Sequence, residues 1–328
     1  MMHTARRSPL FDLFVAPNRI LRSARDGLSP GLPGIRADFC VAESNDDVIP
    51  IVRRLMAAHP HVPSRPLIGD VHVSANPKLN NCIKGWDAAR HEWIVLADSN
   101  VLMPPDYIHR LIAAWRPDTG LVCSTPIGAC PRGFWAEVEC AFLNTLQARW
   151  QYAGEALGLG FAQGKSMLWH RPVLDRNGGI RALAAEIAED AAATKLVRSA
   201  GRRVHLVGIP FDQPLGRRTL RDVWGHQARW VRLRRVTFPL SFAPELLTTA
   251  VIPLGFGIWA AQAGQGAMAA AVMSAVVLWY GAEPVLAAGK GWHTSPGSRL
   301  PSWSVTPLSR SCGLQRGSIR RRSGAEIG

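Results

Sequence analysis

The chain has 328 residues, of which 47% are hydrophobic and 19% are charged, and its net charge is +14. The charged share is below the roughly 25% usual in soluble proteins, which indicates membrane contact, while the length allows a sizeable core. The positive charge indicates an acidic partner, such as nucleic acid, anionic lipid or a phosphorylated substrate. None of the six cysteines forms a Cys-x-x-Cys pair, which argues against a cysteine zinc site.

Apolar runs and amphipathic segments alternate through the middle of the chain. Residues 1–35 are basic and punctuated by Gly, Pro and Ser, so we expect an irregular segment there. The later alternation predicts an α/β fold with a mostly parallel sheet flanked by helices. Strands are expected at 36–42, 66–73, 94–97, 119–125, 164–170 and 202–208, and helices before His59-Pro60 and at about 76–90, 104–115, 133–157, 186–200 and 218–236.

A long apolar stretch follows the last of these helices. No charged residue occurs from Leu246 to Ala282, and Gln262–Gly266 divides the stretch into two halves. Each half is slightly short of the roughly 20 residues that a spanning helix needs. Two tilted spans, a re-entrant hairpin and two buried soluble helices all fit this pattern. The predicted domains are an irregular segment 1–35, a catalytic domain 36–236, a membrane-associated hairpin 237–289 and a disordered basic tail 290–328.

Basic residues flank the apolar stretch on both sides. Four arginines lie between residues 229 and 235, and Lys290 follows the second half. Cytoplasmic loops carry an excess of Lys and Arg, so both flanks are expected in the cytoplasm. We therefore expect a membrane location with the catalytic domain on the cytoplasmic side.

Polar residues follow several of the predicted strands. Glu43 and Asp46 come after the first strand, and Asp98 and Asn100 come after the run 94–97. In open α/β sheets, ligands bind at the carboxyl ends of the strands, although each of these residues could also cap a helix. Gly164-Lys165-Ser166 does not complete a P-loop, because Leu159 replaces the required glycine.

Five short motifs follow one another along the chain. They are Phe39-Cys40-Val41, Asn76-Pro77-Lys78-Leu79-Asn80-Asn81, Ala97-Asp98-Ser99-Asn100, Ile187-Ala188-Glu189-Asp190 and Arg229-Trp230. Their order resembles that of the ceramide glucosyltransferase family, over about residues 38–288. A second Gln-Ala-Arg-Trp, at 147–150, precedes Glu189-Asp190 and is therefore not taken as the family motif.

The resemblance implies a GT-A-like fold and an inverting, metal-assisted hexosyltransferase. A UDP-sugar would be the donor, the hydroxyl of a membrane lipid the acceptor, and Mg²⁺ or Mn²⁺ the cofactor. Glucose and ceramide are the expected substrates. Asp190 would be the catalytic base, and Asp98 and Asn100 would hold the metal. The residues expected to bind the donor are Glu43, Asp46, Lys78, Asp98, His226, Arg229 and Trp230.

Several departures and alternatives accompany this prediction. His226 stands where the family usually has Gln or Arg, and the first acidic position is Glu43 in place of Asp. The family's N-terminal membrane helix and first strand have no visible counterpart before residue 36. A hopanoid or diacylglycerol acceptor, a truncated inactive copy and a basic nucleic-acid-binding protein are the alternatives. No nucleic acid is expected, because much of the positive charge lies in the termini and beside the apolar stretch.

Overall fold

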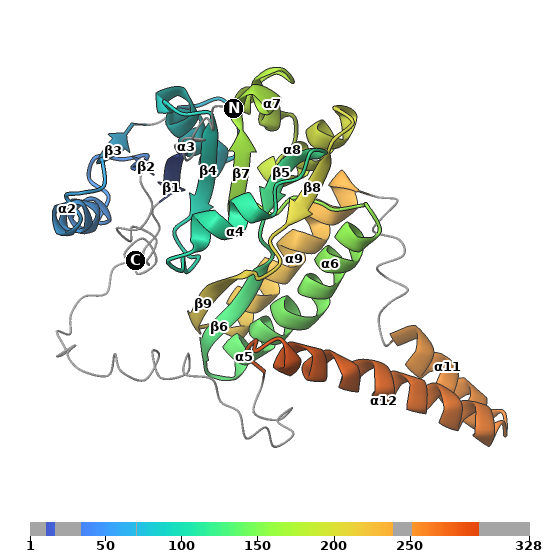
Figure 1. Ribbon diagram of the computed structural model, residues 1–328. Coiled ribbons are helices and arrows are strands. Elements are labelled where there is room, and N and C mark those ends of the chain that lie inside the picture. Colours follow the sequence, from blue (N-terminus) through green and yellow to red (C-terminus); the bar gives the residue numbers. More distant parts are fainter. Residues whose placement is uncertain (1–10, 17–33, 70, 239–250, 295–328) are drawn as a thin grey trace, which may run out of the picture.

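The computed structural model describes residues 11–16, 34–69, 71–238 and 251–294, and a seven-stranded sheet lies at its centre (Figure 1). The strand order is β3-β2-β1-β4-β7-β5-β8. All neighbouring pairs are parallel except those of β7, which is antiparallel to β4 and β5. The predicted α/β fold with a mostly parallel sheet is therefore confirmed. The strands are β1 (Phe11–Ala16), β2 (Ile35–Val41), β3 (Ser64–Ile68), β4 (Trp93–Asp98), β5 (Thr119–Cys123), β7 (Ser166–His170) and β8 (Arg203–Leu206).

Both faces of the sheet are buried, and β4 shows how. Ile94 and Leu96 pack into one core, and Val95 and Ala97 pack into the other. A strand covered on both faces has to be apolar at successive positions, and polar residues return where it leaves the core. The first core includes residues of α3 (Pro77–Ala88) and α8 (Glu189–Ser199), and the second includes residues of α2 (Ile49–Ala58) and α4 (Tyr107–Ala113).

Strand β1 corrects the prediction that residues 1–35 are irregular throughout. It pairs in parallel with β2 on one side and with β4 on the other. Leu13 is buried in the core. The run is only six residues long, carries Asp12 and is surrounded by loop-forming residues, so it gives little signal in the sequence. The sheet thus has a strand in the position where the sequence offered no counterpart.

Two further strands were also not predicted. β6 (Pro126–Arg132) and β9 (Phe211–Arg217) form a separate parallel pair. Both contain proline and glycine, which weaken a strand pattern and which sheets tolerate mainly at edges and bulges. β3 begins and ends earlier than the predicted strand 66–73.

A helical layer covers the small sheet and carries the C-terminal hairpin. α5 (Phe134–Ala141), the π-helical segment η1 (Phe142–Gln147) and α6 (Ala148–Ala156) form one continuous run, as predicted for 133–157. α9 (Leu220–Thr237) also belongs to this layer. Two short helical turns, α7 (Arg171–Asp175) and η2 (Ile180–Ala185), lie between β7 and α8.

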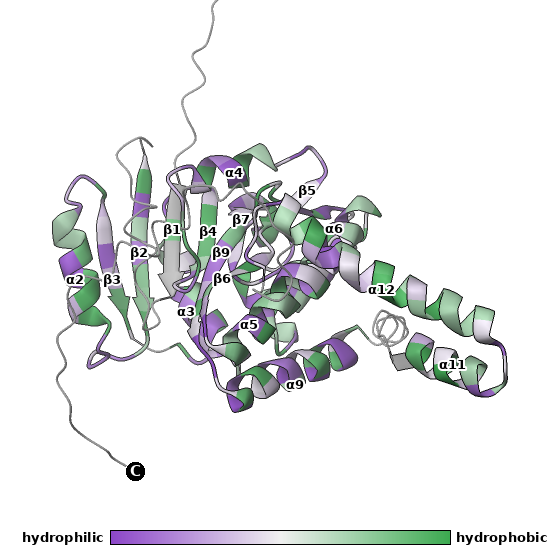
Figure 2. Ribbon diagram, turned by 90° about the horizontal axis from the view of Figure 1, so that it is seen from below, coloured by the Kyte–Doolittle hydropathy of each residue, from purple (hydrophilic) through white to green (hydrophobic). Residues whose placement is uncertain are grey.

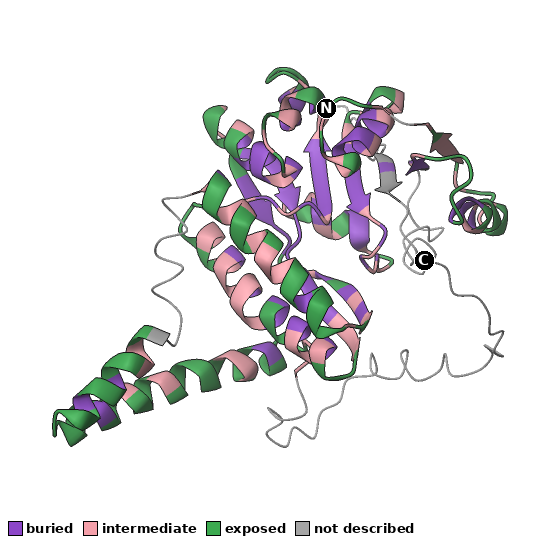
Figure 3. Ribbon diagram, turned by 180° about the vertical axis from the view of Figure 1, so that it is seen from behind, coloured by how far each residue is buried: buried purple, intermediate pink, exposed green. Residues whose placement is uncertain are grey.

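The hairpin consists of α11 (Val251–Gln262) and α12 (Gly266–Gly289), and it projects from the body of the protein (Figures 1 and 3). Its surface is largely apolar (Figure 2) and largely exposed. Among the described helices, α12 is the one long and apolar enough to cross a membrane. The predicted hairpin is thus present from residue 251 onward. Residues 239–250 of that prediction and residues 295–328 of the predicted tail lie outside the described residues.

A candidate active site at the end of strand β4

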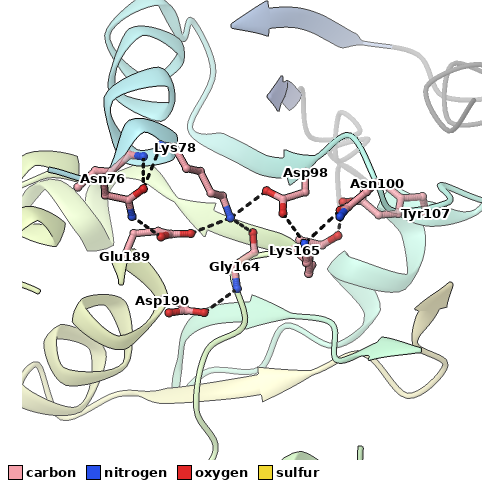
Figure 4. Close-up of polar contacts among 11 residues, drawn as sticks. Asn76, Lys78, Asp98, Asn100, Tyr107, Gly164, Lys165, Glu189 and Asp190 are labelled. Carbon is pink, nitrogen blue, oxygen red and sulfur yellow. Dashed lines mark hydrogen bonds and ion pairs between the residues drawn. The ribbon is translucent and has the colours of Figure 1, made fainter. Parts of the chain in front are cut away.

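Four chain segments meet where β4 ends at Asp98 (Figure 4). Because β7 is antiparallel to β4, with Ala97 opposite Ser166, the residues before β7 lie beside Asp98. The backbone N–H of Asp98 donates to the carbonyl oxygen of Lys165 at 2.9 Å. Helices α3 and α8 also begin here, and they bring Lys78 and Glu189 to the same place.

Lys78 joins three of these segments. Its Nζ lies 2.9 Å from Asp98 Oδ1 and 2.7 Å from Glu189 Oε1, and it donates to the carbonyl oxygen of Gly164. Burial alone would lower the pKa of Lys78, but the two carboxylates outweigh it and raise that pKa well above its ordinary value. Lys78 therefore stays charged at any physiological pH.

Asp98 and Asn100 direct oxygen atoms at a second lysine. Lys165 Nζ lies 2.9 Å from Asp98 Oδ2 and 3.2 Å from Asn100 Oδ1. Burial raises the pKa of Asp98, but Lys78 and Lys165 more than offset this and hold it below its ordinary value. Asp98 is therefore an ionised carboxylate whose two oxygens each face an ammonium group.

These two side chains fit a divalent cation only in part. Their oxygens converge on one positive charge, as the ligands of Mg²⁺ or Mn²⁺ do. Among the described residues, no group of three or more His, Cys, Asp and Glu side chains could hold a metal. Mg²⁺ commonly takes one or two protein carboxylates and completes its shell with phosphate oxygens and water. Asp98 and Asn100 thus suit a cation that arrives together with a phosphate group.

Asp190 and its neighbour Glu189 have different environments. Asp190 accepts hydrogen bonds from the backbone N–H of Gly164 at 3.2 Å and of Ala191 at 2.8 Å. Burial, and then the negative charge of Glu189, raise the pKa of Asp190 to about 6. Burial also raises the pKa of Glu189, but its ion pair with Lys78 and a 2.7 Å hydrogen bond from Asn76 leave it lowered overall. A carboxylate with a pKa near neutrality suits general base catalysis.

Position 164 has no room for a side chain, because the charged cluster surrounds it. A Cβ at this position would lie 2.5 Å from Glu189 Oε1 and 2.7 Å from Lys78 Nζ. Any side chain would therefore displace the ion pair between α3 and α8. The glycine allows the segment before β7 to contact Lys78 and Asp190 through its backbone alone.

The first acidic residues lie two strands away from this cluster. Glu43 and Asp46 are exposed and follow β2, which β1 separates from β4. Asp46 Oδ1 accepts from the backbone N–H of Val48 at 2.9 Å, so this side chain also stabilises the start of α2. Since the three strands are parallel, their carboxyl ends share one edge, with β2 and β4 about 10 Å apart.

The motif residues of α9 make other contacts. His226 Nδ1 lies 2.8 Å from Oε1 of the buried Glu139, which also accepts from Arg218. Trp230 packs against the small core under α5, and Arg229 is exposed. Within the described residues, no hydrogen bond or ion pair joins these side chains to Asp98 or Asp190. Donor binding by His226, Arg229 and Trp230 therefore stays a prediction.

From the sequence, two charged residues of the cluster, Lys165 and Glu189, received no role in the site. Lys165 was considered only as part of a P-loop, and Glu189 only as a member of the Ile187–Asp190 motif, without a role of its own. The signal that would have found Lys165 is the antiparallel direction of β7, which places its first residues beside Asp98. Strand direction is not encoded in the local pattern of apolar residues.

Sheet and cluster together have the arrangement of an α/β protein that binds its ligand at the carboxyl end of a central strand. A comparison with protein-family models identifies which kind: the model of glycosyl transferase family 21 matches residues 38–314. The chain belongs to this family of glycosyltransferases, and the predicted GT-A-like fold class is confirmed.

Two named relatives and one solved structure are similar to this chain. Ceramide glucosyltransferase 1 of Caenorhabditis elegans is 28% identical over 67% of this chain and 48% of its own length. Ceramide glucosyltransferase 3 of the same organism is 26% identical over 61% and 44%. The chain thus spans about half the length of these relatives. A mannosyltransferase from Pyrobaculum calidifontis, solved with GDP-Man and Mn²⁺, is 17% identical, with a TM-score of 0.49 over 87% of this chain and 85% of that one.

Proposed function

We propose that this protein transfers a hexose, glucose in the first instance, from a UDP-sugar to the hydroxyl group of a membrane lipid, with ceramide as the expected acceptor. The observation that carries the proposal is the cluster at the end of β4. It combines a carboxylate with a raised pKa, Asp190, with two lysines that face Asp98, within a chain of family 21. Two relatives named ceramide glucosyltransferases support this choice of donor and acceptor.

The donor diphosphate binds beside Asp98. Lys78 and Lys165 supply positive charge there, and Asp98 with Asn100 would hold Mg²⁺ or Mn²⁺. The cation, when bound, acts as a Lewis acid that stabilises the departing diphosphate. Glu43 and Asp46, about 10 Å along the same edge, bind the uridine. His226, Arg229 and Trp230 complete the donor site from α9.

Asp190 acts on the acceptor. Its carboxylate accepts the proton of the lipid hydroxyl while the hydroxyl oxygen forms a bond to the anomeric carbon of the sugar. The bond between that carbon and the diphosphate oxygen breaks, and UDP leaves with the electron pair. Direct displacement of this kind inverts the anomeric configuration. The hairpin of α11 and α12 brings the lipid to Asp190, with the catalytic domain on the cytoplasmic side of the membrane.

A transfer assay tests the proposal directly. Membranes that carry the full chain are incubated with labelled UDP-glucose or UDP-galactose and a panel of ceramide, hopanoid and diacylglycerol acceptors. We expect labelled glucosylceramide, formed only with a divalent cation. A labelled hopanoid or diacylglycerol would correct the acceptor. Absence of any labelled lipid would indicate an inactive copy. Retention on nucleic acid without transfer would indicate a basic nucleic-acid-binding protein.

The pH dependence of the same reaction tests the role of Asp190. A base has to be deprotonated to accept a proton, and the pKa of Asp190 is raised to about 6. We therefore expect kcat/KM to be flat above pH 7 and to fall about tenfold per pH unit below pH 6. Steady-state rates between pH 4.5 and 8.5 measure this fall in kcat/KM. A midpoint near 4, the ordinary value for Asp, would contradict the assignment.

A further inference from the structure

The second Gln-Ala-Arg-Trp sequence, Gln147–Trp150, has a place in the fold that the proposed chemistry does not use. It lies at the junction of η1 and α6, and its arginine faces the hairpin. Arg149 forms an ion pair with Glu283 of α12, and its guanidinium carbon lies 5.5 Å from the ring centroid of Trp279. One side chain of the catalytic domain thus holds two residues of the apolar hairpin.

Further contacts lie just beyond the end of α12. Asn144 Nδ2 donates to the carbonyl oxygen of His293 at 2.8 Å, and His293 Nε2 lies 2.8 Å from Glu137 Oε2. The hairpin is therefore attached to the catalytic domain at two places, one before the last turns of α12 and one just after them. Figure 1 shows this end of α12 beside α5. Two separated attachments restrict rotation of the hairpin as well as its distance from the domain.

The π-helical segment explains why Asn144 and Arg149 can both contact the C-terminal end of the hairpin. Residues 144 and 149 are five positions apart, which in an α-helix would turn them about 140° away from each other. A π-helix closes its hydrogen bonds from i to i+5, so residues five apart come closer to alignment. Segment η1 covers residues 142–147, between the two positions. The same segment lets Asn144 bond to Gly128 of β6 as well.

The attachment coincides with the edge of the apolar stretch. Glu283 is the first charged residue after Ala282, and Trp279 and Tyr280, both about half exposed, precede it by one turn. Tryptophan and tyrosine concentrate at the boundary between lipid and water, and charged residues avoid the hydrocarbon. This turn of α12 therefore has the composition typical of a membrane boundary, and Arg149 contacts it there.

We propose that Arg149 is a positioning residue that, with Glu283 and Trp279, fixes the catalytic domain at a set height and orientation on the membrane surface. The inference rests on the proposed function, because its consequence is the alignment of Asp190 with a hydroxyl held in the bilayer. A small error in this alignment is costly, since misplacement by about 1 Å can slow a reaction about 100-fold. An acceptor free in solution needs no such alignment.

Variants of the full chain in lipid nanodiscs test the inference. Arg149→Met and Glu283→Gln each remove the ion pair, and the exchanged pair Arg149→Glu with Glu283→Arg restores it with reversed charge. Arg54→Met, on the exposed face of α2, is the matched control. We expect kcat/KM with a long-chain acceptor in the bilayer to fall about tenfold in each single variant and to recover in the exchanged pair. Transfer to a short-chain acceptor in solution, KM for the UDP-sugar and all values for Arg54→Met should stay unchanged.

Hydrogen exchange of residues 283–293 supplies a readout that does not depend on activity. We expect faster exchange in Arg149→Met and wild-type protection in the exchanged pair. Unchanged exchange in Arg149→Met would overturn the inference, as would an equal loss with both acceptors or a failure of the exchanged pair to recover. If the wild-type protein transfers sugar to neither acceptor, the proposed function fails, and hydrogen exchange alone decides whether Arg149 attaches the hairpin.

Discussion

Asp190→Asn is expected to lower kcat about 1000-fold or more while leaving UDP binding nearly unchanged. Asparagine has the same shape and can still accept a hydrogen bond from the backbone N–H of Gly164 or Ala191. It cannot take a proton from the acceptor hydroxyl, and general base catalysis contributes about 10²–10⁴-fold to rates. Steady-state kinetics and calorimetry of UDP binding measure the two effects separately.

The control for this variant is Asp87→Asn, which alters an exposed ion pair with Arg181 at the start of η2. Exposed pairs contribute little to stability, so its kinetics should match those of the wild-type protein. Turnover retained by Asp190→Asn would rule out Asp190 as the base. Loss of UDP binding together with turnover would show that the substitution had damaged the fold around Gly164.

Strand β4, at whose end the site lies, was predictable because it obeys one strong rule. β4 is buried on both faces, so its four central residues are all apolar, and Asp98 is conspicuous at its end. Asp190 was proposed as the base through its place in an ordered set of motifs. The end of β4 depends on a pattern that spans a few residues, whereas Asp190 depends on the order of the motifs that carry the resemblance.

Other features depend on contacts that no local pattern encodes. Lys165 reaches Asp98 because β7 is antiparallel, and Arg149 reaches Glu283, which lies 134 positions further along the sequence. β6 and β9 carry prolines that a separate two-stranded pair tolerates but that hide them from a strand pattern. His226 illustrates the same limit, since its hydrogen bond to Glu139 follows from how α9 packs on α5.

Asp98→Asn is the second substitution for which a large effect is expected. It preserves the volume of the side chain but removes the charge that faces both Lys78 and Lys165. A neutral amide is a far weaker ligand for Mg²⁺ or Mn²⁺ than a carboxylate, and Asn100 would be the remaining partner. We expect UDP-glucose to bind the wild-type protein at least tenfold more tightly with the cation than without it, and to bind the variant equally in both conditions.

Calorimetric titrations with and without Mn²⁺ measure this difference, and Asp87→Asn, which alters the exposed ion pair with Arg181, again provides the control. The two lysines are expected to respond to this substitution in the opposite sense to the metal. Without the Asp98 charge, Lys78 and Lys165 are freer to bind the diphosphate, so metal-independent affinity should be kept or increase. If the wild-type protein binds UDP-glucose equally well in both conditions, the two lysines alone neutralise the charge of the diphosphate.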